Sequence, residues 1–461
     1  MAPQRDLRLA GLVATAAGAL VLALYLAPDY AATTFGALGL VGALASAAGA
    51  ALLLRHPWAL PFAVLACLPV RIPVDIGTEE ANLLLPLYVV VSALALAFGW
   101  QLLRGDARMR ELGPIAWPLA AVVAWTGVAL LWTDDLRQGA IFLTAFVLPF
   151  GLLAVGIARL PWSPRALRWV YGALLASALV YAGVGLYQWW TREVFWNPKL
   201  IVDNAYAPFF RVNSVFWDPS IYGRYLVVAI LATLALVLLG LRDRLVAAGI
   251  AAIAALWLGL FFSFSQSSFA ALVAGTLAIA VIVWRWRAAA ALGLVALLVV
   301  SVGFATPQFR HRLLDESKAG LNKTTSGRAG LVSNGLRIAR DNPVSGVGTG
   351  SFKRAYADRT GLKGREPKKA ASHSTPVTVA AETGIPGLLL LGWLGVAALG
   401  AALRARAPAG AGRVALVAGL TLGAIAVHSF FYNALFEDPT SWALLGLVAL
   451  AVGRRSKEAA A

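Results

Sequence analysis

The chain has 461 residues, of which 60% are hydrophobic, with a formal net charge of +17 and a mean hydropathy of +0.75. A soluble domain of this size is usually less than half apolar, so the composition excludes an ordinary soluble protein. Many uncharged stretches are long enough to cross about 30 Å of hydrocarbon as helices. The sequence therefore predicts an all-α, polytopic helical bundle in a membrane.

Fourteen apolar runs are predicted to span the membrane: 9–27, 33–54, 57–70, 82–103, 114–133, 138–158, 167–187, 219–241, 245–262, 267–284, 288–305, 376–403, 411–430 and 439–453. The run at 57–70 is the shortest and the weakest of these predictions, and a count of twelve spans also stays open. We divide the chain into N-terminal membrane helices (1–187), central membrane helices (188–305) with an outer loop (188–218), a basic loop (306–375), and C-terminal membrane helices (376–461).

The arginines predict the orientation of the bundle. If the N-terminus is cytoplasmic, every second short loop lies inside, and these loops hold most of the cations found in short loops, as the positive-inside rule requires. The inside cations are Arg5, Arg8, Arg55, Arg104, Arg108, Arg110, Arg159, Arg165, Arg168, Arg242, Arg244, Arg285, Arg287, Arg404, Arg406, Arg413, Arg454, Arg455 and Lys457. We therefore expect both termini in the cytoplasm, and the outer and basic loops on the other side.

The basic loop needs an explanation of its own. Residues 306–375 hold 14 Lys or Arg against 5 Asp or Glu, and short helices are expected within them. Long segments translocate largely regardless of charge, so this basicity agrees with an outside location. Two interpretations stay open: attraction to anionic lipid headgroups, or a binding site for a polyanion such as phosphate or pyrophosphate.

Two polar segments border the central spans. In "RVNSVFWDPSIYGRYL", Asp218 is predicted to cap a helix that begins at Pro219, and Arg211 lies in the outer loop before it. Arg224 lies inside that span, where a charge is expensive and should pair or face a cavity. In "FSFSQSSFAAL", Gln266 and four serines occupy one outer turn. Helix capping accounts for two of these five side chains, and the others can line a polar site.

The basic loop has internal order. "GRAGLVSNGLRIARDNP" predicts a short amphipathic helix that carries Arg328 and Arg337 and is closed by Asn342-Pro343. Its expected apolar positions are Leu331, Leu336 and Ile338. The glycines of the following "PVSGVGTGSF" permit a tight backbone that can approach a ligand. This stretch is neither a P-loop, since no Gly-Lys-Ser/Thr follows, nor a dinucleotide fingerprint, since no strand precedes it.

His373 is one of only four histidines, and it precedes a predicted helix start. We expect Thr375 as the N-cap and Pro376 as the first helical residue. The positive helix end favours a neutral imidazole, which can accept a proton as a general base must. The alternative is an interfacial histidine that is wet on one side, and position alone does not separate the two.

Glu382 lies deeper, before "TGIPG", whose glycines and proline should interrupt the helix. Irregular backbone at membrane depth survives only where it is buried in protein or lines a cavity. An acid beside such a break is a functional candidate. Its structural alternative, acceptance of hydrogen bonds from freed backbone groups or pairing with an arginine, is slightly favoured over direct catalysis.

Absent motifs narrow the chemistry. The sequence has no Asp-x-Asp for a metal-bound nucleotide sugar, and no His or Cys cluster with metal-ligand spacing. Acids are nearly absent from the centres of the first eleven spans, whereas proton-coupled transporters usually need them. Neither a metal nor a cofactor is expected, and no nucleic-acid partner.

Three quoted segments resemble bacterial O-antigen ligases. "HSTPVTVAAETGIPG" is similar to that family's motif of His, Asn/Ser/Gln, nine residues, Gly, two residues and Gly/Thr/Tyr, with His373, Ser374, Gly384 and Gly387 in those places. "DNPVSGVGTGSF" resembles the Pro-x-x-Gly-x-Gly segment before the histidine. "RVNSVFWDPSIYGRYL" resembles the Arg…Asn-Pro-Asn segment, with Asp-Pro-Ser in this chain. The resemblance covers residues 205–440, and the histidine motif is shared with bacterial protein O-oligosaccharyltransferases.

The resemblance implies a metal-independent, inverting glycosyltransferase of the GT-C type. It would move a glycan from undecaprenyl diphosphate to the hydroxyl of a glycan or glycolipid acceptor, at the outer face of the bacterial inner membrane. His373 would be the base, with Glu382 as a second catalytic candidate. The residues expected to bind the pyrophosphate are Arg211, Arg224, Gln266, Arg328 and Arg337.

One departure bears on the donor site. The family often carries Ser-Arg where this chain has Ser265-Gln266, so another cation, such as Arg328 or Arg224, would have to compensate. Two alternatives keep the same chemistry: an O-antigen or exopolysaccharide polymerase, and a protein O-oligosaccharyltransferase. A third belongs to another class, a lipid or glycan transporter, which needs no base.

Overall fold

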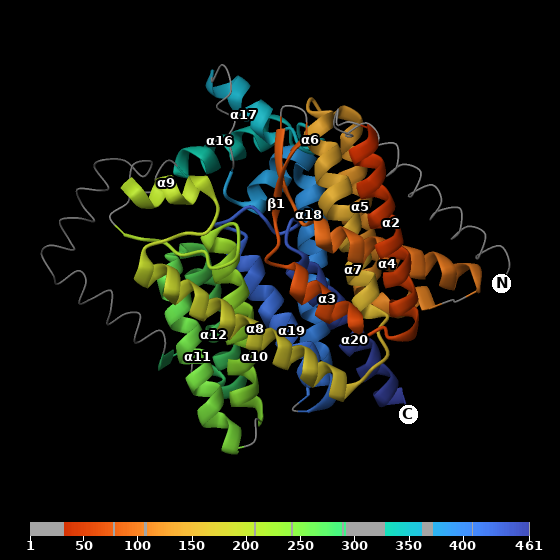
Figure 1. Cartoon of the computed structure of the whole chain (residues 1–461), viewed down its shortest axis with the longest axis vertical. Coiled ribbons are helices and arrows are strands. Elements are labelled where there is room, and N and C mark those ends of the chain that lie inside the picture. The colour runs from red at the N-terminus through yellow and green to blue at the C-terminus, as the bar shows by residue number, and fades with distance from the viewer. Residues whose placement is uncertain are drawn as a thin grey trace, which may run out of the picture.

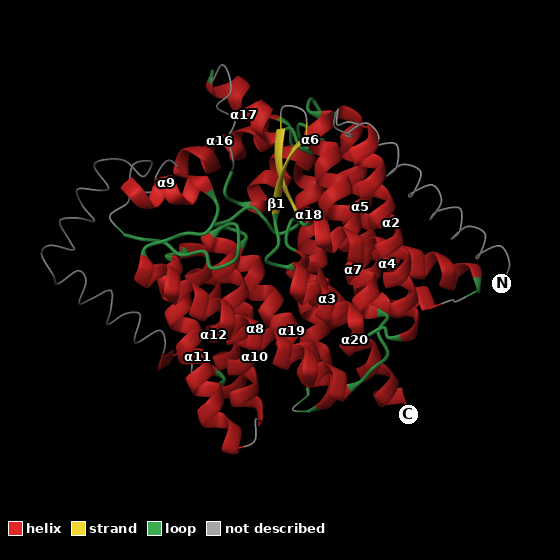
Figure 2. Cartoon of the chain, viewed as in Figure 1, coloured by secondary structure: helices red, strands yellow, loops and turns green. Residues whose placement is uncertain are grey.

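The computed structural model of the chain describes residues 32–76, 79–105, 108–206, 209–240, 243–287, 290–291, 328–361, 372–407 and 409–460. These residues are almost entirely helical, and the strands among them form one short hairpin (Figure 2). The first half contains α2 (Ala32–Arg55), α3 (Ala59–Cys67), β1 (Ile72–Ile76), β2 (Glu79–Leu83), α4 (Leu85–Leu103), η1 (Arg108–Ile115), α5 (Ala116–Val128), η2 (Ala129–Trp132), α6 (Leu136–Ile141), η3 (Phe142–Val147), α7 (Leu148–Ala158) and α8 (Pro164–Thr191). The second half contains α9 (Pro198–Tyr206), α10 (Pro219–Gly240), α11 (Asp243–Ser263), α12 (Gln266–Trp284), α16 (Arg328–Asp341), α17 (Phe352–Thr360), α18 (Thr375–Ala405), α19 (Gly410–His428) and α20 (Pro439–Ala460).

Nine helical stretches in the described part are long and apolar enough to cross a membrane. They are Leu85–Leu103, Leu112–Trp132, Leu136–Ala158, Pro164–Thr191, Pro219–Gly240, Asp243–Ser263, Gln266–Trp284, Thr375–Ala405 and Gly410–His428. Each coincides with a predicted span, so the prediction of a helical, multi-pass membrane protein is confirmed. The predicted runs at 33–54 and 439–453 also form helices, α2 and α20.

The run at 57–70 does not form a spanning helix. Helix α3 has only nine residues, or about 14 Å at 1.5 Å per residue, which is less than half the hydrocarbon thickness. The chain continues into the antiparallel hairpin β1–β2, in which Ile72 pairs with Leu83. Pro69 and Pro73, which flank the end of the run, are poor residues for a helix interior. The runs at 9–27 and 288–305 lie outside the described residues, apart from residues 290 and 291, so the count of about fourteen stays a prediction.

The helices form two groups joined by α19 (Figure 1). Helices α8, α10, α11 and α12 lie on one side, and α2, α4, α5, α7 and α20 on the other. Helix α19 packs against α10 and α12 of the first group and against α18 and α20 of the second. Close approach relies on small residues, as is usual between membrane helices: Gly419 of α19 faces Ala402 of α18.

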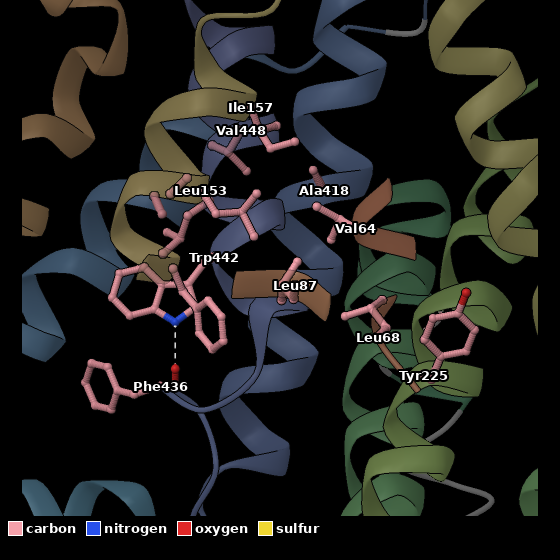
Figure 3. Close-up of a cluster of buried hydrophobic side chains, with 14 of the residues drawn as sticks. Val64, Leu68, Leu87, Leu153, Ile157, Tyr225, Ala418, Phe436, Trp442 and Val448 are labelled. Atoms are coloured by element: carbon pink, nitrogen blue, oxygen red, sulfur yellow. Dashed lines mark hydrogen bonds between the residues drawn. The ribbon is translucent and has the colours of Figure 1, made fainter. Parts of the chain in front are cut away.

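A continuous apolar core links the second group to α10 and α19 (Figure 3). Val64, Leu87, Leu153 and Val448 are all buried there. The polar edge of the Trp442 indole is satisfied within this core, because Nε1 donates to the Phe436 carbonyl at 2.9 Å. This bond fixes the loop before α20 over the core, and that loop contributes to the site described below.

The two ends of the bundle differ in chemistry. The hairpin and helices α9, α16 and α17 lie at one end, which we call the loop end (upper in Figure 1), with the turns 133–135, 264–265 and 429–438. The connections α7–α8, α10–α11 and α18–α19 lie at the opposite end, as does the C-terminal end of α20. Arg159 at the end of α7, Arg244 at the start of α11 and Arg404 in the last turn of α18 flank these connections. The fold is therefore consistent with the predicted orientation.

Candidate functional site

Four membrane helices begin at the loop end around the last turn of α19: α10, α12, α18 and α20. The predicted cap at Asp218 is confirmed, since its Oδ1 accepts from the Ser220 N–H at 2.6 Å. Asp438 repeats this cap before α20, with Thr440 N–H at 3.1 Å, and Ser265 caps α12. The positive ends of four helix dipoles thus point toward one region, which favours a bound anion.

Arg211 and Gln266 both border the turn between α11 and α12. The Arg211 Nε donates to the Ser263 carbonyl at 3.2 Å, and the Asn204 side chain holds the Arg211 backbone through two bonds of 2.9 and 3.0 Å. The Arg211 guanidinium is half-buried, and the Gln266 side chain is exposed. Among the described residues no acceptor is recorded for either Nη of Arg211, so this end is available to an anionic ligand.

Arg224 is buried, with 2% of its side chain exposed, and its Nε lies 3.0 Å from Oδ2 of Asp438. Its Nη1 donates to the Ala434 carbonyl at 3.3 Å, whereas Nη2 has no hydrogen-bond partner in the described part of the chain. The expectation that an intramembrane arginine should pair is therefore confirmed. A contact between Arg224 and a pyrophosphate stays a prediction, and only Nη2 is left to make it.

Several polar residues beside Arg224 were not predicted from the sequence. The His428 Nε2 lies 3.0 Å from Ser267 Oγ, and Arg71 Nη2 donates to the Glu437 carbonyl at 2.7 Å. Burial raises the pKa of the Glu437 carboxyl, against the lowering effect of the Arg71 charge. The signal that could have revealed this loop is the repeated Asp-Pro-Ser/Thr, which starts α10 at Asp218 and α20 at Asp438.

Helix α18 breaks at Gly384, as the sequence predicts, and the break is bound to the glycine-rich segment 343–351. Gly384 has φ +69°, a left-handed conformation. Val347 N–H donates to the Ala381 carbonyl at 2.9 Å, and Gly348 N–H donates to the Glu382 carbonyl at 2.8 Å. Gly346, Gly348 and Gly350 all have positive φ, and they approach the protein's own backbone rather than an open site. The irregular backbone is thus buried in protein.

His373 lies immediately before α18, half-buried, with φ +54°. A left-handed conformation in a residue other than glycine costs on the order of 1–3 kcal/mol, and such strain concentrates at functional sites. The N-cap is Ser374 rather than Thr375, because Thr378 N–H already donates to the Ser374 carbonyl. Thr375 N–H donates to the Ser429 carbonyl at 2.8 Å, which joins His373 to the end of α19 beside His428.

The Glu382 carboxylate accepts a hydrogen bond from the start of the neighbouring helix α17. Its Oε1 accepts from the Phe352 N–H at 3.2 Å, at the N-terminus of α17, and only 9% of the residue is exposed. This is the structural role that the sequence slightly favoured. The carboxyl also borders the cavity considered below, so direct catalysis by Glu382 stays a prediction without a contact of its own.

The amphipathic helix of the basic loop is α16, and it lies against α18. Leu331 and Ile338 are buried as expected, but Leu336 is 53% exposed. It lies five residues after Leu331, or about 140° around the helix, so the two cannot share a face. Gly335 lies on the buried face, where an added Cβ would lie 2.5 Å from a methyl carbon of Val377 in α18. Arg337 is exposed and Arg328 is the first residue of α16, so both stay predicted ligands at the rim of the loop end.

Residues 251–392 match the family model described as O-antigen ligase. This segment of the chain is therefore similar to O-antigen ligases, in agreement with the resemblance seen in the sequence motifs. The matched segment contains Gln266, Arg328, Arg337, His373 and Glu382, whereas Arg211 and Arg224 lie before it. No curated protein matches the chain. Within the described residues, no group of three His, Cys, Asp or Glu side chains lies close enough to hold a metal.

Proposed function

We propose that the chain is an inverting, metal-independent glycosyltransferase that moves a glycan from undecaprenyl diphosphate to an acceptor hydroxyl, in the manner of O-antigen ligases. The donor is a lipid-linked glycan, and the acceptor is a glycan or glycolipid. The reaction takes place at the loop end, which the arginine distribution puts on the extracytoplasmic side of the inner membrane.

The observation that carries this proposal is the strained His373 at the start of broken helix α18, within the family segment. The conformation of His373, at φ +54°, is costly, and the chain sustains it beside the converging helix N-termini. Backbone strain of this kind concentrates at functional sites, which supports a role for His373 at the reacting hydroxyl.

The chemistry follows from these positions. The acceptor oxygen attacks the anomeric carbon, and its proton passes to His373. The bond between that carbon and the phosphate oxygen breaks, and undecaprenyl diphosphate leaves from the opposite face. Arg211, Gln266 and the dipoles of α10, α12, α18 and α20 stabilise the negative charge of the leaving group.

The proposal is tested with purified protein, lipid-linked glycan and candidate acceptors, with mass analysis of the products. We expect a glycosylated acceptor and free undecaprenyl diphosphate from the wild type, and loss of both with His373→Ala. The acceptor that is used distinguishes a ligase from a polymerase or a protein glycosyltransferase. Unaltered turnover in His373→Ala would exclude the proposed mechanism, and lipid movement without transfer would indicate a transporter.

A further inference from the structure

A cavity beside His373 is the strongest feature that the proposed function does not use. It measures about 130 Å³ and lies between α5, α6, α17, α18 and the segment 433–437. Ser372, just before His373, and Thr375, two residues after it, both line the cavity. It is therefore next to the reacting centre, on the side of α18 that faces α5 and away from α12.

Several polar side chains in the cavity wall have no partner within the described residues. The Thr375 hydroxyl is 1% exposed and makes no hydrogen bond. No side-chain hydrogen bond is recorded for Gln138, Asn433 or Glu437, which are half-buried and line the same cavity. A buried hydroxyl without a partner is costly, so Thr375 calls for a ligand that completes it, and the three half-buried side chains are open to the same ligand.

The rest of the wall combines aromatic and aliphatic side chains with the charged Lys353 and Glu382. Trp125, Phe142 and Phe436 border the cavity, and the Trp125 indole is held in place by its bond to the Thr383 carbonyl at 2.9 Å. Aromatic faces beside amides, a hydroxyl and a carboxyl suit a ligand with apolar CH faces and several hydroxyls. A pyranose ring has this composition. At about 130 Å³ the cavity has roughly the volume of four water molecules, so it can receive at most one sugar ring, in part, and not a chain.

The position of the cavity relative to the candidate pyrophosphate contacts indicates whether it binds a sugar of the donor or of the acceptor. The candidate pyrophosphate contacts, Arg211 and Gln266, lie at the turn before α12, on the far side of α19 from the cavity. Inversion requires the acceptor and the leaving group on opposite faces of the anomeric carbon. His373 adjoins both regions along the chain, because Ser372 and Thr375 line the cavity and the Thr375 N–H is bonded to the Ser429 carbonyl at the end of α19. An acceptor held in the cavity and a pyrophosphate held at α12 satisfy this requirement.

We infer that this cavity binds the terminal sugar of the acceptor, with Thr375, Gln138, Asn433 and Glu437 as hydrogen-bonding groups and Trp125 as the stacking face. The inference rests on the proposed function. It assigns the acceptor a site that is separate from the lipid donor, and it limits the recognised part to one sugar.

The test is steady-state transfer with donor and acceptor varied separately, for Thr375→Val and Asn433→Ala. Each variant removes one neutral hydrogen bond, so KM for the acceptor should rise roughly 3- to 10-fold while KM for the donor stays unchanged. Thr375→Val keeps the shape of the side chain and removes an unsatisfied hydroxyl. Its thermal stability should therefore be unchanged or higher, and a merely structural Thr375 would leave both KM values unchanged.

The matched control is Thr360→Val in α17, where the exposed hydroxyl bonds only to the Tyr356 carbonyl in its own helix. It should leave both KM values unaltered. A higher donor KM with an unchanged acceptor KM would mean that the donor's first sugar fills the cavity, and would overturn the assignment. Unchanged values for both substrates in both cavity variants would overturn it as well.

A binding measurement separates this inference from the proposed function. Saturation-transfer NMR on the detergent-solubilised chain with methyl glycosides should detect a weakly bound sugar in the wild type and in Thr360→Val. The signal should be lost in Asn433→Ala. If transfer fails for the wild type but the sugar signal behaves in this way, the proposed function is wrong and the sugar site stands. If transfer proceeds but neither cavity variant changes sugar binding, the site is wrong and the function stands.

Discussion

Replacement of Gly346 by alanine should detach the glycine-rich segment from the break in α18. Gly346 has φ +66°, and an added Cβ would lie within 2.6 Å of the Thr383 backbone nitrogen and closer still to the Glu382 carbonyl. These are backbone atoms of a buried helix, so they cannot swing aside. The segment would have to withdraw, and its two bonds to the Ala381 and Glu382 carbonyls would be lost.

The cost has two parts. An alanine in the left-handed region is strained by roughly 1–2 kcal/mol. Each lost backbone hydrogen bond removes about 0.5–1.5 kcal/mol. Gly346→Ala should therefore lower the free energy of unfolding by about 2–5 kcal/mol. Gly361 provides the matched control, because it has φ +67° but no atom within 4 Å of an added Cβ. Gly361→Ala should lower the free energy of unfolding by the backbone strain alone, roughly 1–2 kcal/mol.

The assay is thermal unfolding of both variants in the same detergent and at the same heating rate, together with the transfer reaction. Gly346→Ala should melt well below Gly361→Ala and should lose activity, because α17 and Glu382 are positioned by the same segment. Equal melting temperatures for the two variants would refute the claim that this segment is bound to the α18 break.

Three further outcomes test the site itself. His373→Ala should fold and bind donor normally, but its turnover should fall by roughly 10²–10⁴, the usual contribution of a positioned base. Near wild-type turnover in His373→Gln, with an unaltered pH profile, would exclude His373 as the base and leave Glu382 as the next residue to test. Arg211→Ala should weaken donor binding by about 1.5–3 kcal/mol. Arg211→Lys should restore only part of this affinity, because lysine lacks the planar guanidinium that can bind two oxygens at once. Unchanged donor affinity in Arg211→Ala would show that Arg211 does not bind the donor. Arg224→Met should destabilise the chain by about 3–5 kcal/mol, and Asp438→Leu in the same chain should recover most of that loss.

Local patterns in the sequence predicted the helices well. Asp218-Pro219 starts α10, Asn342-Pro343 follows the end of α16, and Gly384 breaks α18. Each of these depends on residues within one or two turns of one another, so the physical reason is local. The short α3 is the main error, because its apolar length suits a membrane span whereas Pro69 and Pro73 lead the chain into a hairpin.

The partners of the site residues could not be predicted in the same way. Arg224 pairs with Asp438 across more than two hundred positions, and the Val347 N–H reaches the Ala381 carbonyl only because α18 breaks there. Such contacts depend on how helices pack, which a single apolar stretch does not encode. The wrong prediction that Leu336 would be buried has a different cause. The 100° step between helical residues puts Leu336 about 140° from Leu331, so the sequence alone could have excluded it from the buried face.

The ion pair of Arg224 and Asp438 bears on whether a buried arginine can bind the pyrophosphate of the donor. Its two charged groups lie 3.0 Å apart, and Asp438 also caps α20 through the Thr440 N–H. Loss of one partner leaves an uncompensated buried charge, whereas replacement of both by apolar residues is often neutral for stability. Arg224→Met with Asp438→Leu should therefore fold, less the cap on Thr440, and its donor affinity then reports whether the Arg224 guanidinium contacts the pyrophosphate. Donor affinity that is reduced in the folded double variant would establish Arg224 as a pyrophosphate ligand. Wild-type affinity would show that the pair only joins α10 to the start of α20, and would leave Arg211 and the helix dipoles to hold the leaving group.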